Sequence, residues 1–245
     1  MSRQVNFLFD LDETLLNFHA SEKIGLWEVV EANGCVFDDE LYAFFKARNK
    51  ELWLELEKGT ITREELFKTR FGELFARCGA DASKLDLLKI NSDFISAMSR
   101  NGVLLEGSRE LLARLKDTLP DARIFIVSNG ATVNALGRIK STGLDAYLDG
   151  TFISEDLGVN KPSPEFFRIV LDGIGAHKDD CIVVGDSLTS DMKGAKNSGL
   201  PSCWFRPTGD IACAVEEYGI DFTADNFEDL YDVLVEWATC NHPVK

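Results

Sequence analysis

Carboxylates cluster at the end of a short apolar segment near the start of the chain. Residues 5–9 are followed directly by Asp10, Leu11, Asp12 and Glu13. Carboxylates at the end of a buried strand are costly unless a cation or a proton offsets their charge. Asp10 and Asp12 lie two residues apart, so they share one face of an extended chain. This arrangement predicts a reaction in which two acids act together beside a cation.

Polar residues also follow two other predicted strands, and a lysine precedes a predicted helix. The carboxyl ends of parallel strands meet at one edge of an open α/β sheet, where ligands bind. We therefore expect these residues to converge with Asp10 and Asp12 on one crevice. They are, in chain order, Ser128-Asn129-Gly130 after strand 123–127, Lys161-Pro162 before helix 164–174, and Gly185-Asp186-Ser187 with Asp191 after strand 181–184.

The residue types at this crevice suit phosphoryl transfer. Asp10, Asp12 and Asp186 offer only oxygen ligands, which favours Mg²⁺ over Zn²⁺. A nucleophilic aspartate can form an acyl-phosphate intermediate, but it reaches a phosphate dianion only where positive charge screens the approach. Mg²⁺ and Lys161 would supply that charge.

Two further roles follow from the same chemistry. Ser128 and the backbone amides of Asn129 and Gly130, at the start of a predicted helix, could hold phosphate oxygens. Asp12 could act as general acid for the leaving alkoxide and then as general base for water in a second step.

The order of predicted elements indicates an α/β protein with a helical insertion. Strands and helices alternate from about residue 103, which favours a parallel sheet buried on both faces. Residues 18–100 show helical periodicity with glycine punctuation and predict about four helices. We expect a Rossmann-like core of residues 1–17 and 101–245 and a helical domain of residues 18–100. The predicted core strands are 5–9, 123–127, 151–153, 181–184 and 202–205, and the predicted core helices are 108–118, 131–141, 164–174, 189–198 and 226–239.

The composition narrows the class of partner. The chain of 245 residues carries 26 basic and 41 acidic residues, a net charge of −15, whereas a nucleic-acid-binding protein normally presents a basic face. No segment approaches the roughly 18 apolar residues of a membrane helix, and the first residues do not resemble a signal peptide. We expect a cytoplasmic monomer or weak dimer with reduced cysteines, acting on a small phosphate ester.

The four motifs at the crevice resemble those of the haloacid dehalogenase-like (HAD) superfamily. The helical insertion after the first motif resembles the C1 cap of its subfamily IA. The resemblance implies that Asp10 is the nucleophile and a Mg²⁺ ligand, and that Asp186 is another ligand. It implies that Asp12 is the acid/base and binds Mg²⁺ through its backbone carbonyl.

The same resemblance assigns the remaining motif residues. It implies that Ser128 and Lys161 bind the transferring phosphoryl group, and the backbone amide of Asn129 is expected to bind it too. Thr14 would order the loop of the first motif, and Asp191 would support the site without binding the ion.

Several segments of the cap and of the core resemble the YjjG-type pyrimidine 5′-nucleotidases. The resemblance implies pyrimidine (deoxy)nucleoside monophosphates as substrates. Phe18 and Trp53 could stack on a base, and Asn49 or Arg70 could hydrogen-bond its edge or the sugar. A mobile cap would exclude bulk water during the reaction, with hinges near 15–19 and 99–104. The similar segments are Asp12-Glu13-Thr14-Leu15 with Asn17-Phe18, Asn49-Lys50-Glu51-Leu52-Trp53, Gly59-Thr60-Ile61-Thr62 with Arg70-Phe71, and Cys203-Trp204.

Other functions remain open. Asp12 argues against a dehalogenase, which has no leaving alkoxide to protonate. A phosphonatase needs a cap lysine for a Schiff base, and the candidates Lys23 and Lys50 are typical of surface lysines. A sugar-phosphate mutase shares the core machinery, and a phosphatase for another metabolite such as phosphoglycolate would share it too. A non-catalytic binding protein is disfavoured because the acids and the lysine are all present.

Overall fold

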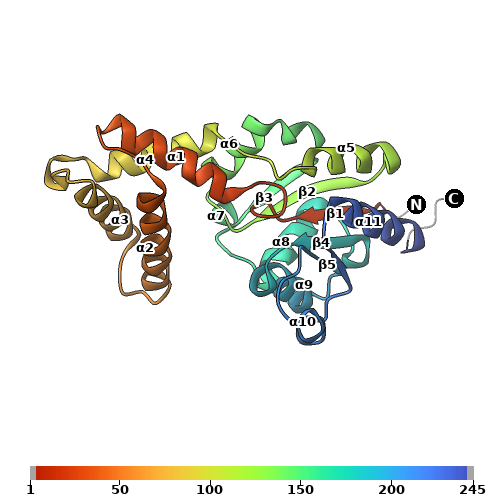
Figure 1. Ribbon diagram of the computed structural model, residues 1–245. Helices are drawn as coiled ribbons and strands as arrows, with labels where there is room; N and C mark the ends of the chain where they lie inside the picture. Colours follow the sequence, from red (N-terminus) through yellow and green to blue (C-terminus); the bar gives the residue numbers. More distant parts are fainter. Residues whose placement is uncertain (1–3, 242–245) are drawn as a thin grey trace. The chain divides into compact units, whose positions relative to one another are not determined.

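The structure, a computed structural model, describes residues 4–241 of the 245-residue chain. The chain divides into two compact units. The α/β unit is formed by the chain up to Phe18 and from Val103 onward, and the helical unit comprises His19–Gly102. The chain therefore leaves the α/β unit after its first strand and its loop, forms the helices of the second unit and returns to the first (Figure 1).

The α/β unit contains, within the described residues, a sheet of six parallel strands in the order β3-β2-β1-β4-β5-β6. This confirms the predicted parallel α/β fold. The strands are β1 (Asn6–Phe9), β2 (Arg123–Ser128), β3 (Gly150–Ile153), β4 (Cys181–Gly185), β5 (Ser202–Phe205) and β6 (Phe222–Ala224).

The first strand lies at the centre of the sheet. Phe9, its last residue, is paired with Ile126 of β2 and with Val184 of β4. The three strands therefore end at nearly the same level, and the residues that follow them meet at one edge. Asp10 continues the contact with β4, because its backbone N–H donates to the carbonyl of Val184 at 2.8 Å.

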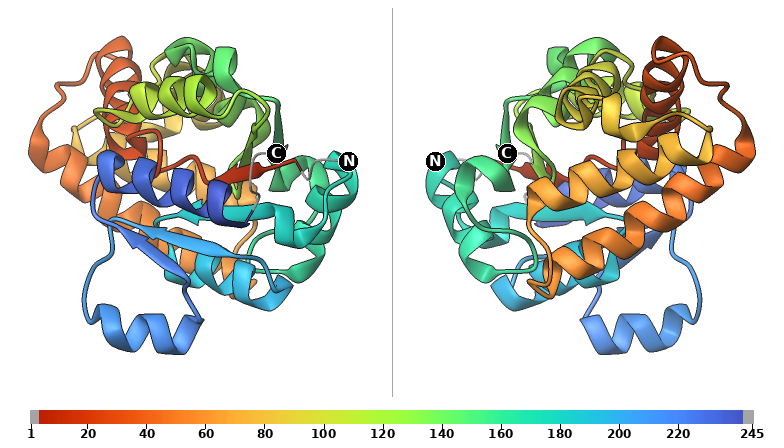
Figure 2. Two further views of the ribbon diagram at one scale, coloured as in Figure 1. Left: turned by 90° about the vertical axis from the view of Figure 1, so that its right-hand side faces the viewer. Right: turned by 90° about the vertical axis from the view of Figure 1, so that its left-hand side faces the viewer.

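Helices cover both faces of the sheet (Figure 2). Phe7 and Phe9 belong to the core that includes α5, α6 and α11, whereas Leu8 belongs to the core that includes α8 and α9. Successive side chains of a strand point to opposite faces, so a strand buried on both faces must be apolar throughout. The helices are α5 (Ser108–Thr118), α6 (Thr132–Thr142), α8 (Pro164–Ile174), α9 (Lys193–Ser198) and α11 (Phe227–Asn241).

Local signals set the start and the end of α8. The side chain of Ser163 accepts a hydrogen bond from the Glu165 amide, Pro164 occupies the first turn, and Gly175 ends the helix with φ of 64°. The helix therefore begins three residues after Lys161, as the sequence predicts.

The sequence pattern does not predict β6 or α10 (Ile211–Tyr218). β6 has three residues and α10 has eight, so each element is too short to repeat its pattern more than about twice. The predicted helix 189–198 is divided into a π-helical turn, Leu188–Met192, and α9.

The helical unit contains four α-helices within the described residues, the number that the periodicity predicts. Its core includes Phe45, Phe71 and Phe94, whose ring centroids lie 5.6 to 5.8 Å apart. None of the helices in residues 4–241 is long and apolar enough to span a membrane. The helices of this unit are α1 (Phe18–Ala32), α2 (Asp39–Glu57), α3 (Arg63–Arg77) and α4 (Leu87–Arg100).

Candidate active site

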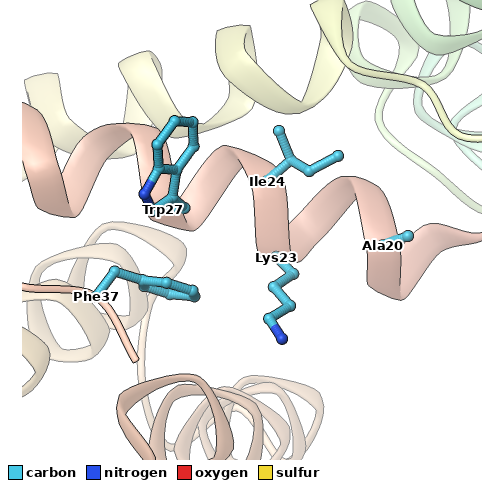
Figure 3. A pocket seen from close by; sticks show the side chains of 5 residues that line it. All are labelled: Ala20, Lys23, Ile24, Trp27 and Phe37. Atoms are coloured by element: carbon cyan, nitrogen blue, oxygen red, sulfur yellow. The ribbon is translucent and has the colours of Figure 1, made fainter. Parts of the chain in front are cut away.

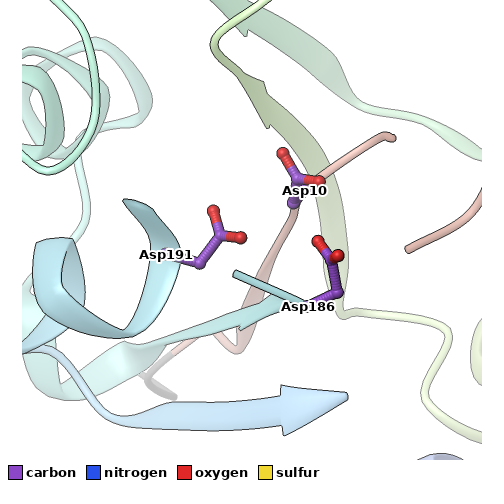
Figure 4. A group of neighbouring side chains, drawn as sticks. All are labelled: Asp10, Asp186 and Asp191. Atoms are coloured by element: carbon purple, nitrogen blue, oxygen red, sulfur yellow. The ribbon is translucent and has the colours of Figure 1, made fainter. Parts of the chain in front are cut away.

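Three aspartates and a lysine meet at the carboxyl edge of the sheet. Asp10, Asp186 and Asp191 each place a carboxylate oxygen within 4.8 Å of the others, at the ends of neighbouring segments (Figure 4). Asp10 follows β1, Asp186 follows β4, and Asp191 lies on the π-helical turn. Asp191, which the sequence analysis placed in a supporting role, thus lies within the cluster itself.

Lys161 supplies the positive charge of this cluster. Its Nζ donates to Asp10 Oδ1 at 2.6 Å, to Asp191 Oδ1 at 2.6 Å and to the carbonyl of Val127 at 2.7 Å. The lysine is 3% exposed, so each of its three N–H donors is satisfied in a buried setting. The ammonium group therefore connects the ends of β1 and β2 with the turn that follows β4.

The carboxylates outnumber the lysine, and the pKa values reflect this imbalance. Burial, together with the negative charge of Asp191 and Asp12, raises the pKa of Asp10 to about 8, although Lys161 acts to lower it. Burial would lower the pKa of Lys161, but the charges of Asp10 and Asp191 outweigh burial and hold it above its usual range. Without a further cation, Asp10 is therefore held back from the ionised form that a nucleophile requires.

Asp186 is placed to bind a cation. Burial and the charge of Asp191 raise the pKa of its carboxyl group to about 6. Its backbone carbonyl accepts a hydrogen bond from the indole N–H of Trp204 at 2.8 Å, which holds the chain in place. No other residue in the described part of the chain donates a hydrogen bond to its carboxylate.

The donor set fits a divalent cation. Asp191 is already engaged, because one of its oxygens faces Lys161 and the other accepts from the Ser187 amide at 3.2 Å. Asp186 keeps both carboxylate oxygens available, and Asp10 Oδ2 accepts only a long hydrogen bond from Thr14 at 3.4 Å. Both carboxyl groups have raised pKa values, which a nearby cation would lower. An all-oxygen set of this kind suits Mg²⁺.

Gly185 makes room for this arrangement. A Cβ atom at this position would collide with the carboxylate of Asp191. The close approach therefore requires glycine immediately before Asp186, which accounts for the Gly185-Asp186 pair in the sequence.

A tight turn shapes the loop that carries Asp10 and Asp12. Glu13 adopts a left-handed conformation with φ of 59°, and the amides of Leu15 and Leu16 return to the carbonyl of Leu11 at 3.0 and 2.9 Å. Thr14 is fully buried, and its hydroxyl donates to Asp10 Oδ2 at 3.4 Å. A left-handed non-glycine residue is strained, and such strain is frequent at functional sites.

Ser128 and Asn129 end β2 next to Lys161. Asn129 binds the backbone of Lys161 in both directions, through its Nδ2 to the carbonyl at 2.9 Å and through its Oδ1 from the amide at 2.8 Å. Its side chain therefore joins two loops, and only its backbone amide remains as a predicted phosphate ligand. The Gly130 amide, also expected at the phosphate, donates to Ser128 Oγ at 3.1 Å in this structure.

The carboxylate of Asp12 lies against an arginine that the sequence analysis did not select. Both Asp12 oxygens accept hydrogen bonds from the guanidinium of Arg138, which is 1% exposed on α6. The predicted cluster of Asp10, Asp12 and Asp186 therefore has Asp191 in place of the Asp12 side chain. The sequence feature that could have identified Arg138 is its position on the helix face that carries Ala135 and Ile139, both of which are buried.

The residues selected for substrate recognition fall into different settings. Phe18 lies in the α/β unit, where its ring centroid is 5.3 Å from the guanidinium carbon of Arg138. In the helical unit Trp53 is 37% exposed, while Arg70 is buried and donates to the side-chain oxygens of Asn49 and Asn91.

Burial dominates the behaviour of Arg70. It lowers the pKa of the guanidinium to about 10, and the rings of Phe67 and Phe71 lie 5.0 Å from its central carbon. Arg70 therefore orients Asn49 and Asn91 rather than presenting its charge at a surface.

A second feature of the helical unit is a hollow of about 330 Å³ along α1 (Figure 3). It contains Lys23, one of the two lysines considered for a Schiff base. The ammonium group of Lys23 forms an exposed ion pair with Asp39 at 2.6 Å, which is typical of a surface lysine. The hollow is lined by Ala20, Lys23, Ile24, Trp27 and Phe37.

Comparison with known proteins shows the family of this chain. The family model described as haloacid dehalogenase-like hydrolase matches residues 6–199. The chain belongs to this family. The crystal structure of the HAD hydrolase YfnB from Bacillus subtilis, bound to magnesium and revealing interdomain movement, matches with a TM-score of 0.79 and 29% identity. The match covers 95% of this chain and 99% of that one.

Two curated relatives of this HAD hydrolase are pyrimidine 5′-nucleotidases. PynA from Streptococcus pneumoniae is 34% identical over 202 residues, which is 82% of this chain and 83% of PynA. YjjG from Escherichia coli is 34% identical over 197 residues, which is 80% of this chain and 83% of YjjG. The resemblance indicated by the motifs and by the cap is thereby confirmed.

Loss of the buried ammonium group of Lys161 should destabilise the folded protein. Lys161→Met should lower the free energy of unfolding by about 3 kcal/mol, because Asp10 and Asp191 would stay buried without their partner. Chemical denaturation of the metal-free protein followed by circular dichroism measures this. Lys68→Met, which removes an exposed pair with Glu64, should change it by less than about 1 kcal/mol. Equal effects of the two variants would contradict the assigned role.

Mg²⁺ should raise the thermal midpoint of the wild-type protein but not that of Asp186→Asn, which lacks one of the carboxylates expected to hold the ion.

The stability of the metal-free protein should also depend on the protonation of Asp186. The raised pKa of its carboxyl group means that the folded state holds the proton more tightly than the unfolded state does. The metal-free protein should therefore lose stability as pH rises from about 4 through 6, and Asp186→Asn should remove that part of the loss. Thermal melts across this range test both points, with the exposed Asp179→Asn as control. A Mg²⁺ effect that persists in Asp186→Asn would refute the assignment.

Proposed function

We propose that this protein is a Mg²⁺-dependent phosphomonoester hydrolase that acts through an aspartyl-phosphate and prefers pyrimidine nucleoside monophosphates. The observation that carries the proposal is the contact of Lys161 with Asp10, beside the available carboxylate of Asp186. The nucleotidase part is supported by the relatives PynA and YjjG, each 34% identical to this chain.

The proposed first step transfers the phosphoryl group to Asp10. A carboxylate oxygen of Asp10 forms a bond to phosphorus, the bond from phosphorus to the ester oxygen breaks, and that oxygen leaves with a proton from Asp12. Lys161, the hydroxyl of Ser128 and the Asn129 amide stabilise the phosphoryl oxygens during transfer. Mg²⁺ held by Asp10, Asp186 and the Asp12 carbonyl would neutralise charge that develops on the phosphoryl group.

The proposed second step releases phosphate. Asp12, now a carboxylate, takes a proton from water as the water oxygen attacks phosphorus, and the bond to Asp10 breaks. Thr14 and Asp191 take no part in bond changes; they hold Asp10 and Lys161 through the contacts described above. A mutase would need a second sugar-phosphate acceptor in place of that water, and nothing in the described residues favours it over hydrolysis.

The helical unit supplies the proposed substrate specificity. Asn49 accepts a hydrogen bond from Arg70 through its oxygen, so its amide nitrogen is the end that is left to donate. No residue in the described part of the chain accepts from that nitrogen. It is suited to a carbonyl oxygen of a pyrimidine, and the partly exposed ring of Trp53 offers a face for stacking.

Phosphate release from a substrate panel tests the function. The panel contains dTMP, dUMP, UMP, AMP, glucose phosphates and phosphoglycolate, each with Mg²⁺ and with EDTA. We expect metal-dependent release that favours the pyrimidine monophosphates, and a loss of more than about 10³-fold in Asp10→Asn. Release that favours another ester would remove the nucleotidase assignment and keep the phosphatase. No release from any ester would refute both.

Asn49→Ala tests the specificity. It should raise KM for dTMP by about 3- to 10-fold, the size expected for one lost hydrogen bond, and leave KM for p-nitrophenyl phosphate within about twofold. Steady-state kinetics with both esters measures this difference. The neighbouring exposed residue provides the control, since Lys50→Ala should change neither value. Equal changes for both esters would contradict a contact with the base.

A further inference from the structure

Arg138 is a buried charge that none of the four motifs includes. It lies in the middle of α6, the helix that follows β2, and its side chain is 2% exposed. A buried guanidinium is unfavourable unless its partners compensate for the lost water. The identity of those partners therefore indicates what the arginine does.

Its partners hold the guanidinium group in one orientation. Nε donates to Asn134 Oδ1 at 2.7 Å, one helical turn earlier. Nη1 and Nη2 donate to the two oxygens of Asp12, the second at 3.1 Å. The ring of Phe18 lies 5.3 Å from the guanidinium carbon. A planar fork constrained in this way gives a bidentate contact of defined geometry.

Asp12 depends on this contact for its position. It precedes the left-handed turn at Glu13, and its side chain is 29% exposed. Arg138 is the only side chain in the described part of the chain that donates to the Asp12 carboxylate. Without it, the carboxylate would be free to rotate into water, and misplacement of a catalytic group by about 1 Å costs roughly 10²-fold in rate.

We propose that Arg138 is a positioning residue. It holds the Asp12 carboxyl group where that group can give a proton to the leaving alcohol in the first step and take one from the attacking water in the second. This inference rests on the proposed phosphatase function. Arg138 acts through Asp12 and not on the substrate, because both of its Nη atoms are directed at the Asp12 carboxylate.

The test compares two esters that differ in their need for a general acid. The alkoxide released from dTMP requires a proton, whereas the phenolate released from p-nitrophenyl phosphate is a stable leaving group. Because kcat/KM reports the steps up to release of the alcohol, Arg138→Met should lower it by about 10²-fold for dTMP and by less than about 5-fold for p-nitrophenyl phosphate. Arg138→Lys, which keeps the charge and loses the fork, should give an intermediate loss with the same preference.

Two controls separate positioning from a structural role. Arg123→Met removes another arginine whose Nε binds an asparagine, Asn6, but at the opposite end of β2, and it should affect both esters equally. In an Asp12→Asn background, Arg138→Met should cause no further loss, because the group that it positions is already inactive. Circular dichroism and thermal melts of every variant confirm that the compared proteins are folded.

Each outcome has one meaning. Equal losses for both esters, or additive losses in the double variant, would overturn the positioning role while leaving the phosphatase intact. Full activity of Arg138→Met on dTMP would do the same. If Arg138→Met does not fold, the ester preference of Arg138→Lys decides. A wild-type protein that hydrolyses neither ester would overturn the proposed function, and the inference with it.

Discussion

Lys161 places one ammonium group against two buried carboxylates and a backbone carbonyl, at the point where the central strands end. Asp10 and Asp191 could not share this space without it, since like charges a few ångströms apart repel strongly where water is excluded. The side chain of Asn129 in turn holds the backbone of Lys161. Asp10, the end of β2 and the acidic turn that follows β4 are thus connected through a single ammonium group.

This cation does not balance the charge, and the imbalance has a functional consequence. The raised pKa values of Asp10 and Asp186 show that the folded chain alone disfavours the ionised forms. An additional cation beside these carboxyl groups would favour their ionised forms.

Each of the two units contains a buried arginine whose charge is compensated by neighbouring side chains. Arg138 in the α/β unit binds a carboxylate, so its charge is neutralised beside the site. Arg70 in the helical unit lies among aromatic rings and binds two asparagine oxygens, which leaves their amide nitrogens as donors. In both cases the guanidinium group fixes the orientation of neighbouring polar side chains.

The sequence by itself determined the fold class, most core elements and the motif residues of the site. Those depend on local signals: apolar strands, helix periodicity and polar residues at strand ends. The sequence pattern does not predict β6 and α10 because segments of three and eight residues repeat a pattern too few times. Only the tertiary structure decided that Asp12 pairs with Arg138, 126 positions away, that Asn129 holds Lys161, and that Arg70 is buried. Such pairs depend on which helix faces pack together, and hydrogen-bonding capacity alone does not select one distant partner over another.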